Sequence, residues 1–361
     1  MTTRPWRYLL AASLILAVAC PPALANGTRA PAAPALKVMT RNIYLGGDIF
    51  RPIGAPDLAE FERRTGELWR EVQTTDFPFR SRLIAREIKR TRPDLIGLQE
   101  VALWRRGPQN LKDGAATPAT RVVYDFLRIL RRALKRADLR YRVAVVQREA
   151  DIEAPVEAGY DVRLTMRDVI LVKRRRGLRV VGARSANYEA DISVPTPAGG
   201  LTSTRGWTAV DARLAGKRFR FVNTHLESAL DATRVAQATE LLAAGGPVDV
   251  RKPVILVGDM NSDPAGRGGN GAGAYDLIEA AGFDDAWPRV NAAAPGLTCC
   301  INSDLSETTP SFDSRIDLIL TRSRALRVRR AVNVGTRARD RRRGLWPSDH
   351  GGTVAGIRFG R

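Results

Sequence analysis

The chain has 361 residues, of which 44% are hydrophobic and 27% are charged, and this composition fits one large globular domain or two small ones. Its formal net charge is +20, and 51 of the 58 basic residues are arginine. A basic surface attracts polyanions, although an arginine bias beside abundant Ala and Gly could also reflect a GC-rich genome. Beyond the N-terminal region no segment is long and apolar enough for the membrane, which excludes a protein built on transmembrane helices.

The N-terminus has the pattern of a secretory signal peptide. Arg4 and Arg7 precede an apolar stretch over 8–19, and an A-x-A site follows at 23–25. A basic start, a short apolar run and small residues at the end are typical of a cleaved signal. We therefore expect residues 1–25 to be removed and the mature protein to be secreted or periplasmic.

Two other features of this region bear on the mature chain. Cys20 could instead be a lipidated cysteine, but Ala17 stands where such sites usually carry Leu. A Pro- and Ala-rich linker is predicted over 26–35, and the catalytic domain over 36–361. The mature chain is expected to carry no transmembrane segment and to be a monomer.

After export only two cysteines remain, Cys299 and Cys300, and they are adjacent. An oxidising compartment permits a disulfide. Neighbouring cysteines can bridge only through a strained eight-membered ring, so a structural staple of the usual kind is not expected, and the sequence leaves their state open. Metal binding by the pair is not expected either, because no second pair lies nearby.

Strand and helix patterns alternate along the chain without internal repeats. Strands are predicted at 36–44, 94–101, 141–147, 168–173, 219–227, 253–258, 314–322 and 352–359, with β structure of uncertain register over 178–210. Helices are predicted at 57–76, 79–92, 121–138 and 232–244. Surface loops are predicted at 107–120 and 267–274, the latter too irregular for a P-loop. The alternation predicts one α/β domain.

The buried strand pattern at 253–258 ends in a polar tip. Asp259 and Asn261 follow it, and residues two apart point the same way along an extended segment. The pair could simply form a turn that ends the strand. Similar tips recur after other apolar runs, however, as with Asn42 and with Glu100, which could also be a solvated edge residue. The recurrence favours a functional site at one edge of a sheet.

The chain contains only two histidines, His225 and His350. Each sits at the tip of a predicted strand, with Asn223 near the first and Asp349 beside the second. A single histidine is usually structural or exposed by accident. A histidine beside a carboxylate is the usual arrangement for an imidazole that moves a proton or stabilises charge. The pattern favours a catalytic role for both histidines.

Six short motifs occur in the order found in the endonuclease/exonuclease/phosphatase superfamily. They are Arg41-Asn42-Ile43, Leu98-Gln99-Glu100-Val101, Asn223-Thr224-His225-Leu226, Gly258-Asp259-Met260-Asn261, Arg315-Ile316-Asp317 and Ser348-Asp349-His350. The chain resembles this superfamily, which includes pancreatic-type deoxyribonucleases, abasic-site endonucleases, neutral sphingomyelinases and inositol-polyphosphate phosphatases. The resemblance implies a four-layer αββα sandwich with two mixed β-sheets packed face to face. It also implies metal-dependent cleavage of a phosphate ester.

The resemblance also implies a metal site. Glu100 corresponds to the principal Mg²⁺ ligand, with Asn42 close to the same ion, and Mn²⁺ is a possible substitute. Asp349 corresponds to a metal-linked acid that orients His350. His350 itself corresponds to the histidine that stabilises charge on the scissile phosphate or acts as acid/base. Oxygen ligands of this kind suit a Mg²⁺ ion that keeps open positions for phosphate and water.

The remaining motif residues are implied to act on water and phosphate. Asp259 corresponds to the carboxylate that activates or aligns the attacking water, and Asn261 to the amide that holds the phosphate. His225 corresponds to a second phosphate-contacting imidazole. Asp317 corresponds to a supporting acid hydrogen-bonded within the cluster.

Two departures from the family pattern affect the substrate. Arg167 and Asp168 stand where many relatives carry Gly or Tyr; Arg167 could bind phosphate and Asp168 could join the acids, or the two could form a surface ion pair. Tyr44 replaces the aspartate of abasic-site enzymes, which disfavours that branch.

The sequence therefore predicts an exported Mg²⁺-dependent phosphodiesterase. A nuclease of little sequence preference is the leading interpretation, because of export, the second histidine and the basic surface. A sphingomyelinase-like hydrolase of phospholipid or inositol phosphate is the alternative within the same chemistry. A non-catalytic protein that binds polyanions is the alternative of another class.

Overall fold

The computed structural model describes residues 1–2, 33–109 and 119–360. The predicted signal peptide and most of the predicted linker lie outside the described residues. Ala33–Arg361 forms one compact unit. Within the described residues, no helix has both the length and the apolar character needed to cross a membrane.

The first sheet has eight strands in the order β15-β16-β1-β2-β6-β3-β4, with β5 also paired to β6. Its strands are β1 (Ala35–Asn42), β2 (Leu95–Gln99), β3 (Leu103–Pro108), β4 (Arg121–Asp125), β5 (Tyr141–Val156), β6 (Tyr160–Lys173), β15 (Leu326–Val334) and β16 (Gly352–Phe359). Strands β1 and β2 are parallel and their other neighbours are antiparallel, so the sheet is mixed.

The second sheet has six strands in the order β13-β14-β12-β11-β10-β7. Its strands are β7 (Leu178–Asn187), β10 (Gly206–Leu214), β11 (Lys217–His225), β12 (Val254–Asp259), β13 (Asp284–Asp285) and β14 (Asp317–Arg322). This sheet is also mixed, because β11 and β12 are parallel. A separate hairpin is formed by β8 (Ile192–Thr196) and β9 (Gly199–Ser203).

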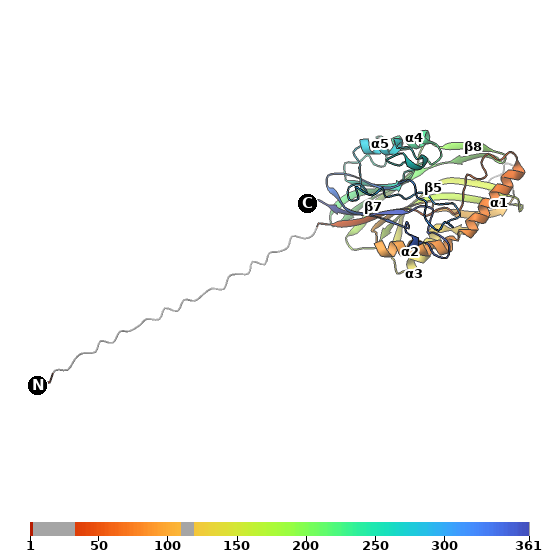
Figure 1. Ribbon diagram of the computed structural model, residues 1–361. Helices are drawn as coiled ribbons and strands as arrows, with labels where there is room; N and C mark the ends of the chain where they lie inside the picture. The colour runs from red at the N-terminus through yellow and green to blue at the C-terminus, as the bar shows by residue number, and fades with distance from the viewer. Residues whose placement is uncertain (3–32, 110–118, 361) are drawn as a thin grey trace. The chain divides into compact units, whose positions relative to one another are not determined.

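Helices cover the outer face of each sheet (Figure 1). The first sheet packs against α1 (Leu58–Thr74), α2 (Phe77–Thr91) and α3 (Phe126–Arg136), and the second against α4 (Asp231–Leu242) and α5 (Gly273–Ala280). Two short 3₁₀ turns, η2 (Arg267–Gly269) and η3 (Ala338–Asp340), lie in the connections. Asp57, Asp76 and Asp125 begin α1, α2 and α3 by accepting hydrogen bonds from backbone N–H groups of the first turn.

Alternation along β12 shows how the layers form. Ile255 and Val257 point into the core between the sheets, whereas Val254 and Leu256 point into the core beneath α4 and α5. Successive side chains of a strand face opposite ways, so a strand that is apolar throughout can be buried on both faces. The two sheets pack face to face between the helices, which confirms the predicted four-layer αββα sandwich.

The sheets approach each other closely next to the strand ends. At Gly97 of β2, a Cβ atom would collide with the Asn223 side chain of β11 and with Val257 of β12. Glycine is therefore required there by space, and its absence of a side chain lets polar groups of the two sheets meet.

Several predicted boundaries are wrong. Residues 121–125 of the predicted third helix form β4, because they pair with β3, and the helix begins only after the Asp125 cap. The predicted strands at 141–147 and 168–173 are parts of one long hairpin, β5–β6, whose register shifts interrupt the simple alternation. Helix α5 was not predicted, and the predicted loop at 107–120 contains the end of β3.

Candidate active site

The site is built where parallel strands of both sheets end together. Asn42 at the end of β1 is opposite Gln99 at the end of β2, and His225 of β11 is opposite Asp259 of β12. Glu100 follows β2 directly. Parallel strands deliver their ends to one edge, so residues far apart in sequence meet there, as the sequence predicted.

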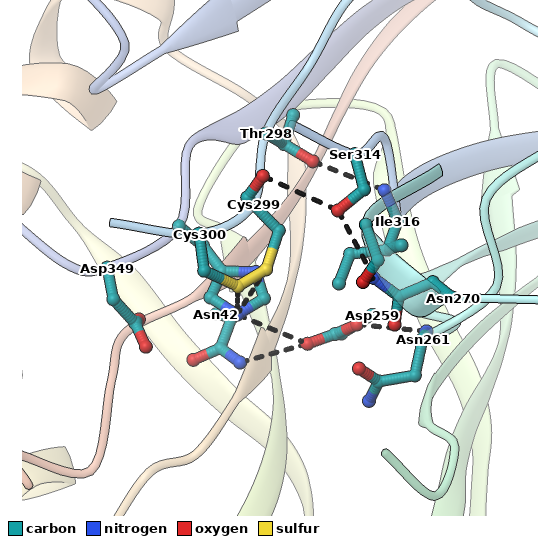
Figure 2. The surroundings of a disulfide bond; sticks show 12 residues. Asn42, Asp259, Asn261, Asn270, Thr298, Cys299, Cys300, Ser314, Ile316 and Asp349 are labelled. Atoms are coloured by element: carbon teal, nitrogen blue, oxygen red, sulfur yellow. Dashed lines mark hydrogen bonds and ion pairs between the residues drawn. A yellow bond between two sulfur atoms is a disulfide. The ribbon is translucent and has the colours of Figure 1, made fainter. Parts of the chain in front are cut away.

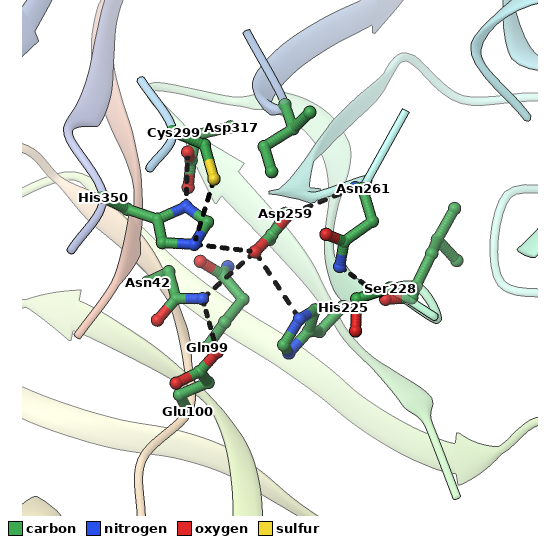
Figure 3. Close-up of polar contacts among 12 residues, drawn as sticks. Asn42, Gln99, Glu100, His225, Ser228, Asp259, Asn261, Cys299, Asp317 and His350 are labelled. Carbon is green, nitrogen blue, oxygen red and sulfur yellow. Dashed lines mark hydrogen bonds and ion pairs between the residues drawn. The ribbon is translucent and has the colours of Figure 1, made fainter. Parts of the chain in front are cut away.

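Asn42 links the two sheets (Figure 3). Its Nδ2 donates to Glu100 Oε1 at 2.9 Å and to Asp259 Oδ2 at 3.0 Å. The other Glu100 oxygen accepts from the backbone N–H of Leu45 at 2.8 Å. The Asn42 Oδ1 accepts from the N–H of Tyr44, so the amide orientation is fixed by contacts on both ends. Asn42 thus holds two carboxylates in register across the sheet interface.

Asp317 orients the imidazole of His350. The His350 Nδ1 lies 2.9 Å from Asp317 Oδ2, and its Nε2 lies 3.7 Å from Asp259 Oδ2. The resemblance assigned the orienting role to Asp349, and that assignment is wrong. Asp349 instead contacts the Ser348 hydroxyl and faces the same pocket as Glu100. The reason is that β14 is paired with β12, which puts Asp317 directly opposite Asp259.

Two buried arginines hold the loops that carry these residues. Arg41 pairs with Glu87 at 3.0 Å and donates to the carbonyls of Asn42 and His350. Arg80 donates to the carbonyls of Ile43, Tyr44 and Pro347. These carbonyls lie at the end of β1 or in the loops beyond the strands, and a guanidinium supplies the several donors they need.

His225 and Asn261 complete the cluster around Asp259. The His225 Nε2 lies 3.5 Å from Asp259 Oδ2, and the Asn261 N–H donates to Asp259 Oδ1 at 3.1 Å. Asn261 has a φ of 46° and Glu100 a φ of 56°, both in the left-handed region. Such backbone conformations in residues other than glycine concentrate at functional sites. Every candidate site residue named from the sequence except Arg167 lies in this cluster or directly supports it.

The pocket above the cluster has a volume of about 240 Å³. Its walls include Glu100, Asp259, Asn261, Asp349 and both histidines. The site is therefore a hollow into which a small charged group can enter from solvent.

The two histidines have opposite electrostatic environments. Burial lowers the pKa of His350, but the carboxylates of Asp317, Asp259 and Asp349 outweigh burial, and the pKa lies well above its usual value. For His225, burial together with the Arg205 guanidinium holds the pKa well below its usual value. The site thus combines a cationic imidazolium with a neutral imidazole.

Sequence reasoning missed Arg205 and Glu149. Arg205 lies 3.0 Å from His225 Nδ1, 3.2 Å from Glu227 and against the pocket. Glu149, Asp168 and His225 place ligand atoms within 4.8 Å of one another. Arg205 belongs to the segment of uncertain register, and the buried face of Glu149 was hidden by the β5 register shift. No sequence signal that we used could have found either residue.

The Asp168 side chain joins the buried acids of the site, whereas the Arg167 side chain does not. Asp168 is fully buried and accepts from Asn223 at 3.2 Å, so it joins the acids rather than a surface ion pair. The Arg167 guanidinium instead points away from the pocket. It binds the carbonyls of Val101 and Ala102 and the Asp125 carboxylate at 2.8 Å. Successive residues of β6 face opposite sides of the sheet, so the predicted phosphate contact of Arg167 is wrong.

Cys299 and Cys300 form a disulfide (Figure 2). Because the bond joins neighbouring residues, it closes no long loop. It is therefore not a structural staple of the usual kind, as the sequence predicted. Its sulfur atoms lie 3.8 Å and 3.6 Å from His350 Nε2, and Cys300 lines the pocket. The disulfide is therefore part of the wall of the candidate active site.

The donors present fit a divalent metal ion. Glu100 and Asp349 line the pocket with carboxylate oxygens, which are the ligands that Mg²⁺ and Mn²⁺ prefer, whereas the Asn42 oxygen accepts from Tyr44 and its Nδ2 faces Glu100. The pKa of Asp349 is raised to about 7, chiefly by burial; His350 opposes this rise, and the Glu100 carboxylate adds to it because the two like charges repel each other. A cation between them would remove that repulsion. The residues that would hold it are Glu100 and Asp349, and Asn42 would fix Glu100 beside the ion.

The sequence profile described as the Endonuclease/Exonuclease/phosphatase family matches residues 66–350. The chain belongs to this family. Members are metal-dependent hydrolases of phosphate esters, so the chain is a metal-dependent phosphoesterase of this class. A search of curated protein sequences finds no match.

Solved structures share the fold. A family protein from Leptotrichia buccalis C-1013-b is 15% identical with a TM-score of 0.55, and the match covers 90% of this chain and 100% of that one. Mannosyl-6-phosphatase Bt3783 from Bacteroides thetaiotaomicron is 18% identical, with a TM-score of 0.52 and coverage of 90% and 100%. TDP2 of D. rerio, complexed with a single-strand DNA product, is 14% identical, with a TM-score of 0.51 and coverage of 90% and 98%. Identities this low establish the fold alone.

Proposed function

We propose that this chain hydrolyses phosphodiester bonds with a bound divalent ion, Mg²⁺ in the first place and Mn²⁺ as a substitute. The observation that carries the proposal is the position of Asp259, which lies between Asn42 and both imidazoles at the base of the pocket. One carboxylate surrounded in this way can receive a proton from water while donors on either side contact a phosphate.

Each residue of the cluster has its own role in the proposed reaction. Asp259, held by Asn42 and by the Asn261 N–H, takes the proton of the attacking water. His350, oriented by Asp317, presents Nε2 to an oxygen that gains negative charge. His225 and the Asn261 amide contact the phosphate. A divalent ion at Glu100 and Asp349 would neutralise charge on the phosphate oxygens.

The charge of the pocket favours diesters over monoesters. Among its described lining residues are four carboxylates, Asp48, Glu100, Asp259 and Asp349, and one guanidinium, Arg205. A phosphodiester carries one negative charge, whereas a monoester carries close to two at neutral pH. Even with the His350 imidazolium counted beside Arg205, the carboxylates outnumber the cationic side chains, so the protein's own groups repel the more highly charged monoester more strongly.

Two substrate classes are proposed for this reaction. Nucleic acid is supported by the second histidine, the net charge of +20 and the DNA product bound to TDP2 of D. rerio. A lipid phosphodiester is supported by an apolar cavity beside the pocket, described below. Export is proposed from the N-terminal signal pattern, and N-terminal sequencing of the secreted protein should begin at Asn26. A non-catalytic polyanion binder would show salt-dependent binding without product.

The reaction class is tested with methyl p-nitrophenyl phosphate and p-nitrophenyl phosphate, which share a leaving group and differ in charge. We expect kcat/KM to be about tenfold higher for the diester, consistent with roughly 1.4 kcal/mol of added repulsion. A chelator should abolish turnover, and Mg²⁺ should restore it. A faster monoester, or turnover indifferent to the chelator, would overturn the proposal.

Metal binding is tested by calorimetry on Glu100→Gln. Loss of the principal carboxylate should weaken Mg²⁺ binding by about 10- to 100-fold, the usual scale for a damaged metal site. Glu279→Gln is the matched control, because Glu279 is exposed on α5. Equal binding by both variants would place the ion elsewhere.

A further inference from the structure

A second cavity lies beside the catalytic pocket. The two share three lining residues, Ile49, Phe50 and Met166. The second cavity has a volume of about 80 Å³. Since one water molecule needs only about 10–15 Å³ of space measured in this way, the cavity admits a short apolar segment.

The wall of this cavity is almost entirely hydrocarbon. Apart from Thr65 and Ser203, every lining side chain is apolar. The Thr65 hydroxyl donates to the Phe61 carbonyl at 2.8 Å, and the Ser203 hydroxyl donates to Glu227 at 3.4 Å. A sugar or base placed there would lose hydrogen bonds to water without regaining them, which disfavours its binding. The cavity therefore rejects the polar parts of a nucleotide.

The β8–β9 hairpin covers one side of the cavity, and β8 lies at the same end of the sandwich as α1 (Figure 1). Its alternate residues Ile192, Val194 and Leu201 line the cavity. Ser193 and Thr202 are exposed, with their hydroxyls 2.8 Å apart. The hairpin thus adds an apolar wall that the two main sheets do not supply.

Phe50 lies where the two cavities adjoin. This side chain is 44% exposed and lines both the catalytic pocket and the apolar cavity. An exposed aromatic side chain at such a junction offers apolar contact to a chain that is leaving water. A charged pocket with a hydrocarbon cavity beside it matches an amphiphilic molecule.

We propose that the apolar cavity receives an acyl chain of a phospholipid whose phosphodiester is hydrolysed in the adjoining pocket. This inference rests on the proposed function and specifies its substrate. In the reaction the water oxygen bonds to phosphorus, one P–O ester bond breaks, and the departing alcohol gains a proton. The products are an alcohol and a phosphomonoester, and no other reactant is needed.

The substrate test compares dihexanoylphosphatidylcholine with glycerophosphocholine. The two share the headgroup and the phosphodiester and differ in the acyl chains. Below the critical micelle concentration, we expect kcat/KM to be at least about tenfold higher for the acylated compound. That ratio corresponds to roughly 1.4 kcal/mol, less than the gain from fully burying one leucine-sized side chain. Supercoiled plasmid is assayed in parallel as a polar phosphodiester.

Two substitutions on β9 locate the effect. Leu201→Trp fills the cavity from the hairpin, and Thr202→Trp places the same side chain on the exposed face one residue later. We expect Leu201→Trp to reduce the preference for the acylated substrate about tenfold, and Thr202→Trp to retain it. Circular dichroism of both variants verifies that they are folded.

Binding measured in the absence of turnover tests the acyl-chain site independently of catalysis. In the presence of a chelator, calorimetry should show tighter binding of dihexanoylphosphatidylcholine than of glycerophosphocholine, with the difference lost in Leu201→Trp. Equal binding and equal kcat/KM for the two compounds would overturn the acyl-chain assignment. Plasmid cleavage without lipid hydrolysis would overturn it too, while leaving the proposed phosphodiesterase intact. Acyl-dependent binding with no hydrolysis of any phosphodiester would support the acyl-chain site and contradict the proposed function.

Discussion

The Nδ1 atom of His350 lies 2.9 Å from Asp317 Oδ2, which fixes the ring so that Nε2 points toward Asp259. Asp317 is fully buried, and it reaches this place because β14 is registered against β12. An imidazole held in this way is oriented before any substrate arrives. The pair is therefore the strongest element of preorganisation in the site.

Asp317→Asn should lower kcat by about 10²- to 10⁴-fold, the range contributed by an oriented acid/base, with KM little changed. The asparagine keeps the shape but removes the charge that holds the ring. In a His350→Ala background the same substitution should cause little further loss, because the two residues act as a unit. Multiplicative losses in the double variant would show that Asp317 acts independently.

Arg167→Met should lower the free energy of unfolding by about 2 kcal/mol, since it removes charged hydrogen bonds to Val101, Ala102 and Asp125. KM should stay within about twofold of the original value, because Arg167 does not face the pocket. Arg205→Met is the matched control and should raise KM. Denaturant unfolding and steady-state kinetics separate the two outcomes, and a raised KM in Arg167→Met would restore the sequence-based assignment.

Glu149→Gln should stabilise the protein at alkaline pH. Burial raises the pKa of Glu149 to about 8 in the folded chain, against 4.5 for an unperturbed glutamate. The unfolded chain therefore releases this proton first, and stability is lost as pH rises from 4.5 to 8, by at most roughly 1.4 kcal/mol per pH unit. Glutamine removes this loss. The melting temperature of Glu149→Gln should exceed that of the original protein at pH 8 and converge with it at pH 4, whereas a constant difference would contradict the assignment.

Thiol counting tests the disulfide. The denatured protein from Asn26 onward should bind no alkylating reagent before reduction and two equivalents after it, because Cys299 and Cys300 are bonded to each other. Mass spectrometry of the peptide that contains both residues gives the count directly. Alkylation of both cysteines without a reductant would show free thiols beside His350.

Sequence patterns predicted the elements whose local residue preferences agree with their burial in the folded protein. Strands such as β12 are apolar throughout and bounded by turn residues, so their burial is visible in sequence. The 121–125 segment was taken for helix because its helical pattern runs into that of α3, and only pairing with β3 makes it a strand. The β8–β9 hairpin carried no sequence pattern that indicated a substrate, because the sequence does not show that its apolar residues line a cavity.

The candidate site was largely visible because its residues occur in short motifs at strand ends. The motifs do not show how the strand ends pair with one another. Asp317 rather than Asp349 contacts the His350 ring, because of the register between β14 and β12. Arg205 and Glu149 lie within strands or loops that have no motif, and only the packing of the two sheets brings them to His225.

The most direct test of the account is hydrolysis of a phosphodiester panel, plasmid, glycerophosphocholine and dihexanoylphosphatidylcholine, by the original protein and by His350→Ala. Each is assayed with Mg²⁺ and with a chelator. The account predicts turnover of at least one diester with Mg²⁺, none with the chelator, and a loss of about 10²-fold or more in the folded variant. Absence of turnover on every diester, or equal turnover by folded His350→Ala, would contradict the assignment of this site.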